Sequence, residues 1–328
     1  MNDSYEAFEY VWDGKSIEIS KEDFDEAVEA RKVLVCLMDM ESLFGVVARA
    51  YIDLEKSLLS ASVEWSLEGA LMSDRIGFFD KSREEINLKT LALLSSAGIF
   101  QERMDRLAKK GAVTGFDWAE FAPQRSIFFD SSFSFRVMCA LRNFAIHDSL
   151  PISNFTVSSA VETESGRMTE GAPWRKRLTS NPVIKTEPLT SSTKIRAATR
   201  DEILGRGMEA LDLKMLVREY IQILHNIRSL FHSQTECSLQ RAIKHLAKLK
   251  NQLELANNKP CSETYIGRVG DEFEEAIYIE PNRLSRVLEA RDKWKILGGV
   301  RRFYISSEAL AAEGVWSGDL DDLYIKQR

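Results

Sequence analysis

Three residues near the end of one predicted helix carry the side chains best suited to chemistry in this chain. Arg142 supplies a permanent cation, Asn143 an amide, and His147 an imidazole whose unperturbed pKa is ~6.5. Such an imidazole can accept and donate protons near neutral pH, and a guanidinium can hold a phosphate as negative charge builds on it. The amide can orient the other two groups. These side chains are the ones needed to cleave RNA without a metal, and we predict that all three are catalytic.

The segment that carries these residues has an apolar face and a polar face. At ~100° per residue, the following side chains fall close to one direction: Met138, Leu141, Phe144 and Ala145. Arg136, Asn143 and His147 fall on the opposite side, whereas Arg142 falls on the border between the faces. We therefore expect something outside this helix to complete the site. His147 precedes Pro151 by four residues, close to the helix C-terminus, where the helix dipole favours its protonated form.

Other cationic and aromatic residues are candidates for binding an RNA backbone. The set comprises Arg136, Trp174, Arg175, Lys176, Arg177, Arg241, Lys244 and Lys248. Trp174 could stack on a base while the three cations after it neutralise phosphates, although a flexible surface loop explains the same run. The cations of the 239–255 segment, with His245 among them, are equally typical of a solvated helix face. His225 and His232, which bracket Arg228, are expected to be bundle or interface residues rather than a second catalytic set.

Charge is unevenly distributed along the chain. The net charge is −6, but residues 1–30 hold ten acidic side chains against two lysines, whereas residues 171–200 hold seven basic side chains against one glutamate. Local potential, rather than net charge, governs where a polyanion docks. The acidic total therefore leaves RNA binding open.

Several classes of protein are disfavoured by composition. No apolar run approaches the ~20 residues that span a bilayer, and the first residues are acidic rather than apolar. Four widely spaced cysteines, Cys36, Cys139, Cys237 and Cys261, match neither a zinc site nor a disulfide framework. The chain also lacks a phosphate-binding glycine loop. We expect a cytoplasmic protein with reduced, mostly buried cysteines, no cofactor, no metal and no membrane association.

Apolar spacing predicts a mainly α protein in three parts. Residues 1–20 form a β-hairpin whose turn is Asp13-Gly14, residues 21–256 form a helical domain, and residues 257–328 form a small α+β segment. Within the helical domain, a basic loop excursion is expected at about 152–205, beginning with a strand at 154–161.

The helices of that domain are predicted from their spacing and their caps. Either one long helix or two helices interrupted near Gly45 follow Lys21. A further helix, with Ser82 as its N-cap, stops at Gly111. A loop ending near Pro123 then leads to the motif helix, which is capped by a residue between 130 and 132. Further helical segments are 211–231 and 239–255. After Cys261 the expectations are strands at 276–279 and 303–305, a helix from about 282–285 and an acidic tail.

The motif and its surroundings resemble the signature helix of HEPN-domain proteins. In that family an Arg is followed by a polar residue, often Asn, and by a His four to six residues after the Arg; here Leu141-Arg142-Asn143-Phe144 and His147-Asp148-Ser149-Leu150-Pro151 carry the match. The stretch from Asn87 to Ala97 is similar to the preceding helix of a HEPN subset in bacteria. The resemblance covers roughly residues 20–256. A tyrosine motif that follows the His in one toxin subtype is absent, which disfavours that subtype.

The resemblance implies an up-and-down helical bundle that forms a homodimer with two copies of the motif in one cleft. It also implies a metal-independent ribonuclease in which His147 assists attack of the ribose 2′-hydroxyl, Arg142 stabilises the phosphorane and Asn143 orients the groups. A toxin or antiviral defence effector, with an antitoxin or defence-system partner, fits this chemistry. A non-catalytic HEPN-like scaffold that binds RNA or a protein is the alternative. A structural bundle with a coincidental motif, expected to be a monomer, is the third.

Overall fold

The computed structural model describes residues 4–9, 15–69, 72–111, 113–163, 174–261, 264–269, 273–279 and 283–302. The protein is mainly helical, with two small antiparallel sheets, which confirms the predicted mainly α class. No helix in these ranges combines the length and the apolar character needed to cross a lipid bilayer.

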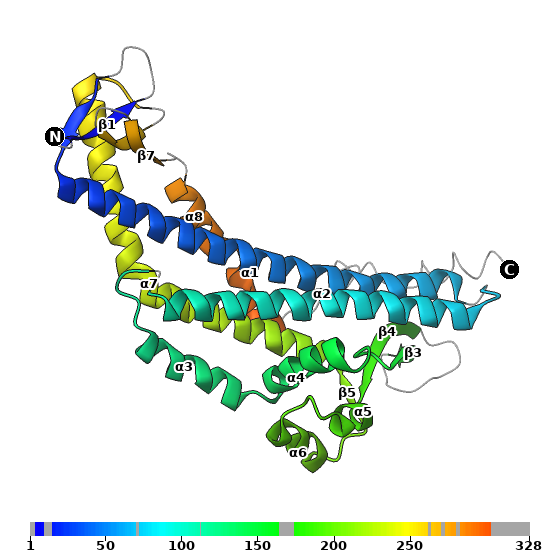
Figure 1. Ribbon diagram of the computed structural model, residues 1–328. Coiled ribbons are helices and arrows are strands. Elements are labelled where there is room, and N and C mark those ends of the chain that lie inside the picture. The colour runs from blue at the N-terminus through cyan, green and yellow to red at the C-terminus, as the bar shows by residue number, and fades with distance from the viewer. Residues whose placement is uncertain are drawn as a thin grey trace, which may run out of the picture.

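Two long helices form the spine of the molecule (Figure 1). Helix α1 (Lys21–Glu68) begins where Ser20 accepts a hydrogen bond from the backbone N–H of Asp23 at 3.0 Å, and it continues through Gly45 without a break. Helix α2 (Arg75–Lys109) returns antiparallel beside it, with the Phe44 and Phe100 rings 5.4 Å apart. One glycine costs a helix only about 1 kcal/mol, which packing along α1 offsets.

The predicted N-cap of the second helix was wrong by eight residues. Asp74, not Ser82, caps α2 by accepting from the backbone N–H of Gly77 at 2.8 Å. The helix extends toward its N-terminus because the Phe78 ring packs 5.4 Å from Trp65 of α1. Gly111, with φ +60°, follows the end of the helix as predicted.

Two shorter helices lie beneath α2. Helix α3 (Trp118–Ser131) occupies part of the segment expected to be a loop. Asp117 caps it by accepting from two backbone N–H groups, and the helix continues through Pro123. The motif helix α4 (Phe133–His147) begins after Ser132 and ends before Pro151, as predicted. Ser132 accepts from the backbone N–H of Phe135 at 3.1 Å.

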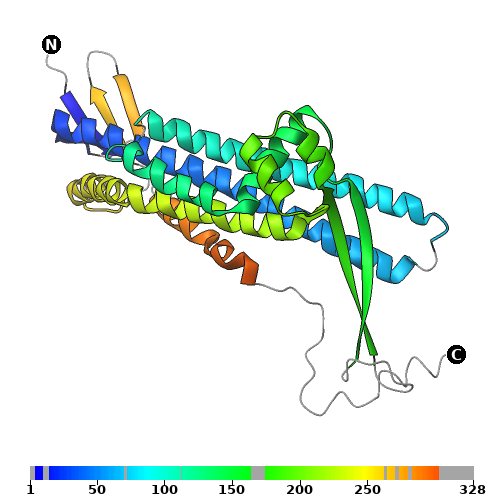
Figure 2. The same cartoon turned by 90° about the horizontal axis from the view of Figure 1, so that it is seen from below.

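The segment after α4 is more ordered than a basic loop. Strand β3 (Asn154–Thr163) pairs with β4 (Trp174–Lys185), and β4 pairs at its far end with β5 (Ala210–Asp212). Figure 2 shows the β3–β4 pair projecting from the helices. Helices α5 (Thr186–Ser191) and α6 (Ala197–Gly205) follow β4. The loop prediction was wrong for β4 because the strand gains its hydrogen bonds from β3, which sequence spacing alone does not specify.

Helix α7 (Leu213–Asn257) is one continuous helix where two segments were expected. It packs along α1, and its buried face includes Leu224, Phe231, Leu239 and Leu246. Phe231 and Leu239 are separated by polar residues in the sequence, but Thr235 between them is fully buried and donates to the carbonyl of Phe231 at 2.8 Å. Packing against the neighbouring helices therefore keeps the helix continuous.

The two ends of the chain share one sheet. Strands β1 (Ser4–Glu9) and β2 (Ile17–Ile19) pair antiparallel, but β1 also pairs with β6 (Thr264–Val269), which pairs with β7 (Phe273–Ile279). The segments 1–20 and 257–328, expected as separate parts, are thus joined by backbone hydrogen bonds. The Asp13-Gly14 turn, the 303–305 strand and the acidic tail lie outside the described residues.

The last described elements run back along the bundle. Helix α8 (Arg283–Lys293) packs on α1, and the 3₁₀ helix η1 (Lys295–Arg302) packs on α7 (Figures 1 and 2). Their buried residues, among them Val287, Leu297 and Val300, belong to the same hydrophobic core as α1 and α7.

Candidate active site on helix α4

Helix α4 presents its three motif residues in different ways. Asn143 and His147 are exposed, whereas Arg142 is half-buried, with 29% of its side chain accessible. On the opposite face Met138, Leu141 and Phe144 are buried, as the helical spacing predicted, while Ala145 is only partly buried. Arg142 and His147 are five residues apart, so they project about 140° from one another around the helix.

Arg142 is held on the surface of α2. Its Nη2 donates to Oε1 of Glu102 at 2.7 Å, and its guanidinium lies against Gly98, one helical turn before Glu102. No partner for its buried Nε is found among the described residues. A guanidinium can donate five hydrogen bonds, so this contact leaves most of that capacity available to a ligand.

A cavity of about 580 Å³ lies beside Arg142, between α2, α3, α4 and the start of α6, with Tyr220 and Ile227 of α7 in its wall. Arg142 and Asn143 line it, but His147 does not. The structure therefore brings two of the three predicted catalytic residues to one cavity and places the third on the neighbouring surface at the end of the same helix.

Three more arginines line this cavity, and two of them are paired with carboxylates. Arg136 donates to both oxygens of Glu202, at 2.9 and 2.8 Å, and Arg125 pairs with Asp105. The Arg136 hydrogen bond holds the pKa of the Glu202 carboxyl below its ordinary value. The guanidinium of Arg196 lies 5.7 Å from the centre of the Phe129 ring. Arg136, predicted to bind RNA, thus links α4 to α6.

The interior wall of the cavity holds two groups with raised pKa values. Burial raises the pKa of the Cys139 thiol to about 11, although the charges of Arg125, Arg142 and Arg196 oppose the shift. Burial also raises the pKa of Tyr220 well above its ordinary value; its hydroxyl accepts from Gln101 at 3.1 Å. Both groups are therefore neutral at pH 7 and contribute packing and polarity to the wall rather than charge.

Comparison with protein-family models, with curated proteins and with solved structures gives no match to this chain.

The remaining RNA-binding candidates lie away from the cavity. Residues 174–177 belong to β4, where Trp174 is opposite Thr163 and Arg177 is opposite Ala160; their side chains lie outside the described part of the chain. On α7, Arg241 and Lys244 are exposed, but Lys248 pairs with Asp23 at 3.0 Å.

His245 does not join the exposed cations of α7. It is buried, and its ring contacts the carbonyl of Asp23 at 2.9 Å and the carboxylate of Glu26 at 3.1 Å. The cationic stripe is thus partly used to bind the acidic first turns of α1.

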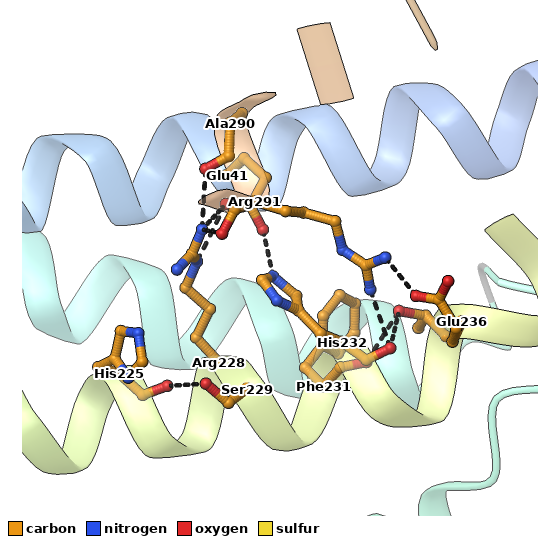
Figure 3. Close-up of polar contacts among 10 residues, drawn as sticks. Glu41, His225, Arg228, Ser229, Phe231, His232, Glu236, Ala290 and Arg291 are labelled. Carbon is orange, nitrogen blue, oxygen red and sulfur yellow. Dashed lines mark hydrogen bonds and ion pairs between the residues drawn. The ribbon is translucent and has the colours of Figure 1, made fainter. Parts of the chain in front are cut away.

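A second cluster of charged side chains is buried between α1, α7 and α8 (Figure 3). Arg228 and His232 of α7 both reach Glu41 of α1; the His232 Nε2 to Glu41 Oε1 distance is 2.5 Å, and Arg228 Nε donates to Oε2 at 3.0 Å. Arg228 also donates to the carbonyls of Ala290 and Arg291, at 2.9 and 3.0 Å. These carbonyls are in the last turn of α8, where they have no partner within the helix.

A side chain of α8 in this cluster also contacts α7. Arg291 donates to the carbonyl of His232 at 2.9 Å and pairs with Glu236 at 2.6 Å. Burial alone would raise the pKa of Glu41, but His232 and Arg228 outweigh it and lower that pKa. Burial lowers the pKa of His232 against the effect of Glu41. The cluster fastens α8 to the bundle, which agrees with the structural role expected of His232 and Arg228.

His225 lies one turn before this cluster and has a packing role. It is buried, its Nδ1 has no hydrogen-bond partner among the described residues, and its ring packs against Gly298 of η1. Burial and the charge of Arg228 lower its pKa.

Within the described ranges, no three His, Cys, Asp or Glu side chains are close enough together to bind a metal ion. The cysteines there are all free; Cys36 and Cys261 are buried, Cys139 is partly buried and Cys237 is exposed.

Two residues that shape the site were missed from the sequence, Gly98 and Glu102 of α2. Their signal is local: a glycine within a strongly helical segment, followed four residues later by a carboxylate on the same face. That pattern marks a place on a helix where another side chain can approach closely. It does not identify Arg142 as that side chain.

Proposed function

We propose that this protein is a metal-independent endoribonuclease of HEPN type, with Arg142, Asn143 and His147 as its catalytic residues. One observation carries the proposal: all three residues are reachable from solvent on one helix, with Arg142 and Asn143 in a cavity wall and His147 exposed nearby. An Arg and a His at similar spacing on α7, Arg228 and His232, are instead enclosed in the bundle.

The chemistry follows from the side chains. His147 accepts the proton of a ribose 2′-hydroxyl, whose oxygen forms a bond to the adjacent phosphorus while the bond from phosphorus to the 5′ oxygen breaks. The protonated imidazole returns a proton to the leaving 5′ oxygen. The products are a 2′,3′-cyclic phosphate and a 5′-hydroxyl. Arg142 stabilises the charge that builds on the phosphorane, and Asn143 orients the substrate and the imidazole.

The directions of the side chains support a homodimer. Because Arg142 and His147 project about 140° apart on α4, one copy does not direct both at one phosphate. Two copies that meet along α4 would combine Arg142 of one with His147 of the other. Helices α1, α2, α4 and α7 would then form the HEPN-like bundle of each copy. We place the protein in the cytoplasm, as a toxin or antiviral effector restrained by an antitoxin or defence-system partner.

The test is cleavage of a labelled single-stranded RNA by the purified full chain in the presence of a chelator. The wild type should release fragments with cyclic phosphate ends, and a DNA of the same sequence should stay intact because it lacks the 2′-hydroxyl. His147→Ala should lower kcat by about 10²- to 10⁴-fold. Its circular dichroism and melting temperature should match the wild type, because His147 is exposed. Equal cleavage by His147→Ala prepared in parallel would show a contaminating nuclease and refute the proposal.

The second candidate function is a non-catalytic scaffold that binds RNA or a protein. Arg142 pairs with Glu102, and Arg136 pairs with Glu202. These ion pairs favour the scaffold, because paired arginines can serve the fold alone. The same assay separates the two functions. A scaffold for RNA gives a stable complex with intact RNA, whereas the enzyme gives fragments.

A further inference from the structure

Gly98 occupies an unusual position for a glycine. It is buried in the middle of a 35-residue helix, and its φ is not positive, so the backbone does not require glycine there. A Cβ atom placed on Gly98 would lie 2.6 Å from Nη1 of Arg142 and still closer to Cζ and Nε. The absent side chain is what allows the guanidinium to lie against α2.

Glu102 holds the guanidinium from one side only. The Nη2 to Oε1 distance of 2.7 Å is the single hydrogen bond between the two side chains, and Glu102 is 58% exposed. An exposed ion pair of this kind adds little net stability, because water competes for both charges. A phosphate can engage a guanidinium through two parallel hydrogen bonds, which are stronger. Glu102 therefore restrains Arg142 without preventing exchange for a phosphate.

We propose that Gly98 and Glu102 are positioning residues for Arg142: Gly98 provides its seat on α2, and Glu102 occupies its guanidinium until an RNA phosphate replaces the carboxylate. This inference rests on the proposed ribonuclease function for the role of Glu102. The seat itself depends only on packing. The two parts are therefore tested by different measurements.

The packing of Arg142 against Gly98, called the seat here, is tested by a double-mutant cycle of melting temperature, which requires no RNA. Gly98→Ala should lower the melting temperature of the wild type, because the new methyl group displaces the guanidinium. In an Arg142→Ala background the same change should leave the melting temperature unchanged or raise it by about 1–2 °C, because alanine favours helix and nothing blocks the methyl group. Equal effects of Gly98→Ala in the two backgrounds would refute the seat.

Gly45 of α1 provides a matched control, since it is also a glycine within a long helix. A Cβ atom there would meet only Nε1 of Trp294, at an ordinary 3.7 Å. Gly45→Ala should keep the wild-type kcat and KM. Gly98→Ala should lower kcat with little change in KM, because the displaced guanidinium no longer stabilises the charge that builds in the transition state. A KM effect with unchanged kcat would contradict positioning of Arg142.

The exchange is tested by RNA affinity, measured by fluorescence anisotropy in the His147→Ala background so that RNA is not cut. Glu102→Gln should tighten binding by about two- to fivefold at low salt, and the gain should shrink as salt rises. Unchanged affinity would refute the exchange. If the wild type neither binds nor cleaves RNA, the proposed function fails and the role of Glu102 fails with it, whereas the stability cycle still decides the seat.

Discussion

Helices α4 and α7 each contain an arginine followed closely by a histidine, and the environments of the Arg142–His147 and Arg228–His232 pairs differ. On α4, Arg142 and His147 are five residues apart, half-buried and exposed respectively. On α7, Arg228 and His232 are four residues apart, and Arg228 is only 2% exposed. A spacing of four residues leaves two side chains about 40° apart on a helix, and a spacing of five leaves them about 140° apart.

The one-residue difference in spacing determines whether the arginine and the histidine can share a partner. Arg228 and His232 project to the same side and share one carboxylate, Glu41, from another helix. Arg142 and His147 project to different sides, so Glu102 contacts the arginine alone. The α7 pair is held by hydrogen bonds to Glu41 and to the last turn of α8, and it serves the fold. The α4 pair retains hydrogen-bonding capacity toward solvent, which a catalytic group requires.

Stability should separate the two regions most strongly. Arg228→Ala leaves Glu41 buried without its guanidinium partner and should lower the free energy of unfolding by about 3–5 kcal/mol. Arg142→Ala breaks a partly exposed pair and should cost about 1 kcal/mol or less. Urea unfolding of both variants measures the difference. Similar losses for the two would show that burial does not distinguish the regions.

The pH dependence of stability should also differ between the two regions. Burial lowers the folded-state pKa of His232 below its unfolded value of ~6.5. Between those two pKa values the unfolded chain binds the proton first, so stability is full above pH ~6.5 and is lost as pH falls through the folded pKa. The lowered pKa of Glu41 acts in the same direction at more acidic pH.

Urea unfolding between pH 5 and pH 8 checks this expectation. His232→Gln removes the titrating group and can still donate to Glu41, so its stability should depend less on pH in that range. His147→Ala serves as the comparison on α4, because His147 is exposed and lies outside the Glu41 cluster. An unchanged slope in His232→Gln would assign the pH dependence to other groups.

Thiol reactivity gives a further comparison of the α4 cavity with the surface of α7. The pKa of Cys139 is raised to about 11, so little thiolate forms at pH 8, whereas Cys237 on α7 is exposed. Iodoacetamide should label Cys237 first and Cys139 on the order of 100-fold more slowly. Mass spectrometry of the digested protein follows both sites. Rapid labelling of Cys139 would mean that the cavity opens more widely than the structure shows.

Helical periodicity accounted for much of the fold but not for its short elements. It predicted α4 with both ends, and its buried face at Met138, Leu141 and Phe144, because one face of the helix is consistently apolar. It missed α3, where Pro123 favoured a loop. It also missed β4, whose strand depends on pairing with β3. Local spacing does not report contacts with distant segments.

Residue spacing alone specifies α4 as an amphipathic helix with Asn143 and His147 on its polar side, because side-chain direction follows from ~100° per residue. Which charged groups are available for chemistry depends instead on the packing of distant segments. Glu102 meets Arg142 from 40 residues away, and Glu41 meets Arg228 from 187 residues away. The packing of α1, α2 and α7 sets those distances, and with them the burial that fixes one arginine and leaves the other accessible.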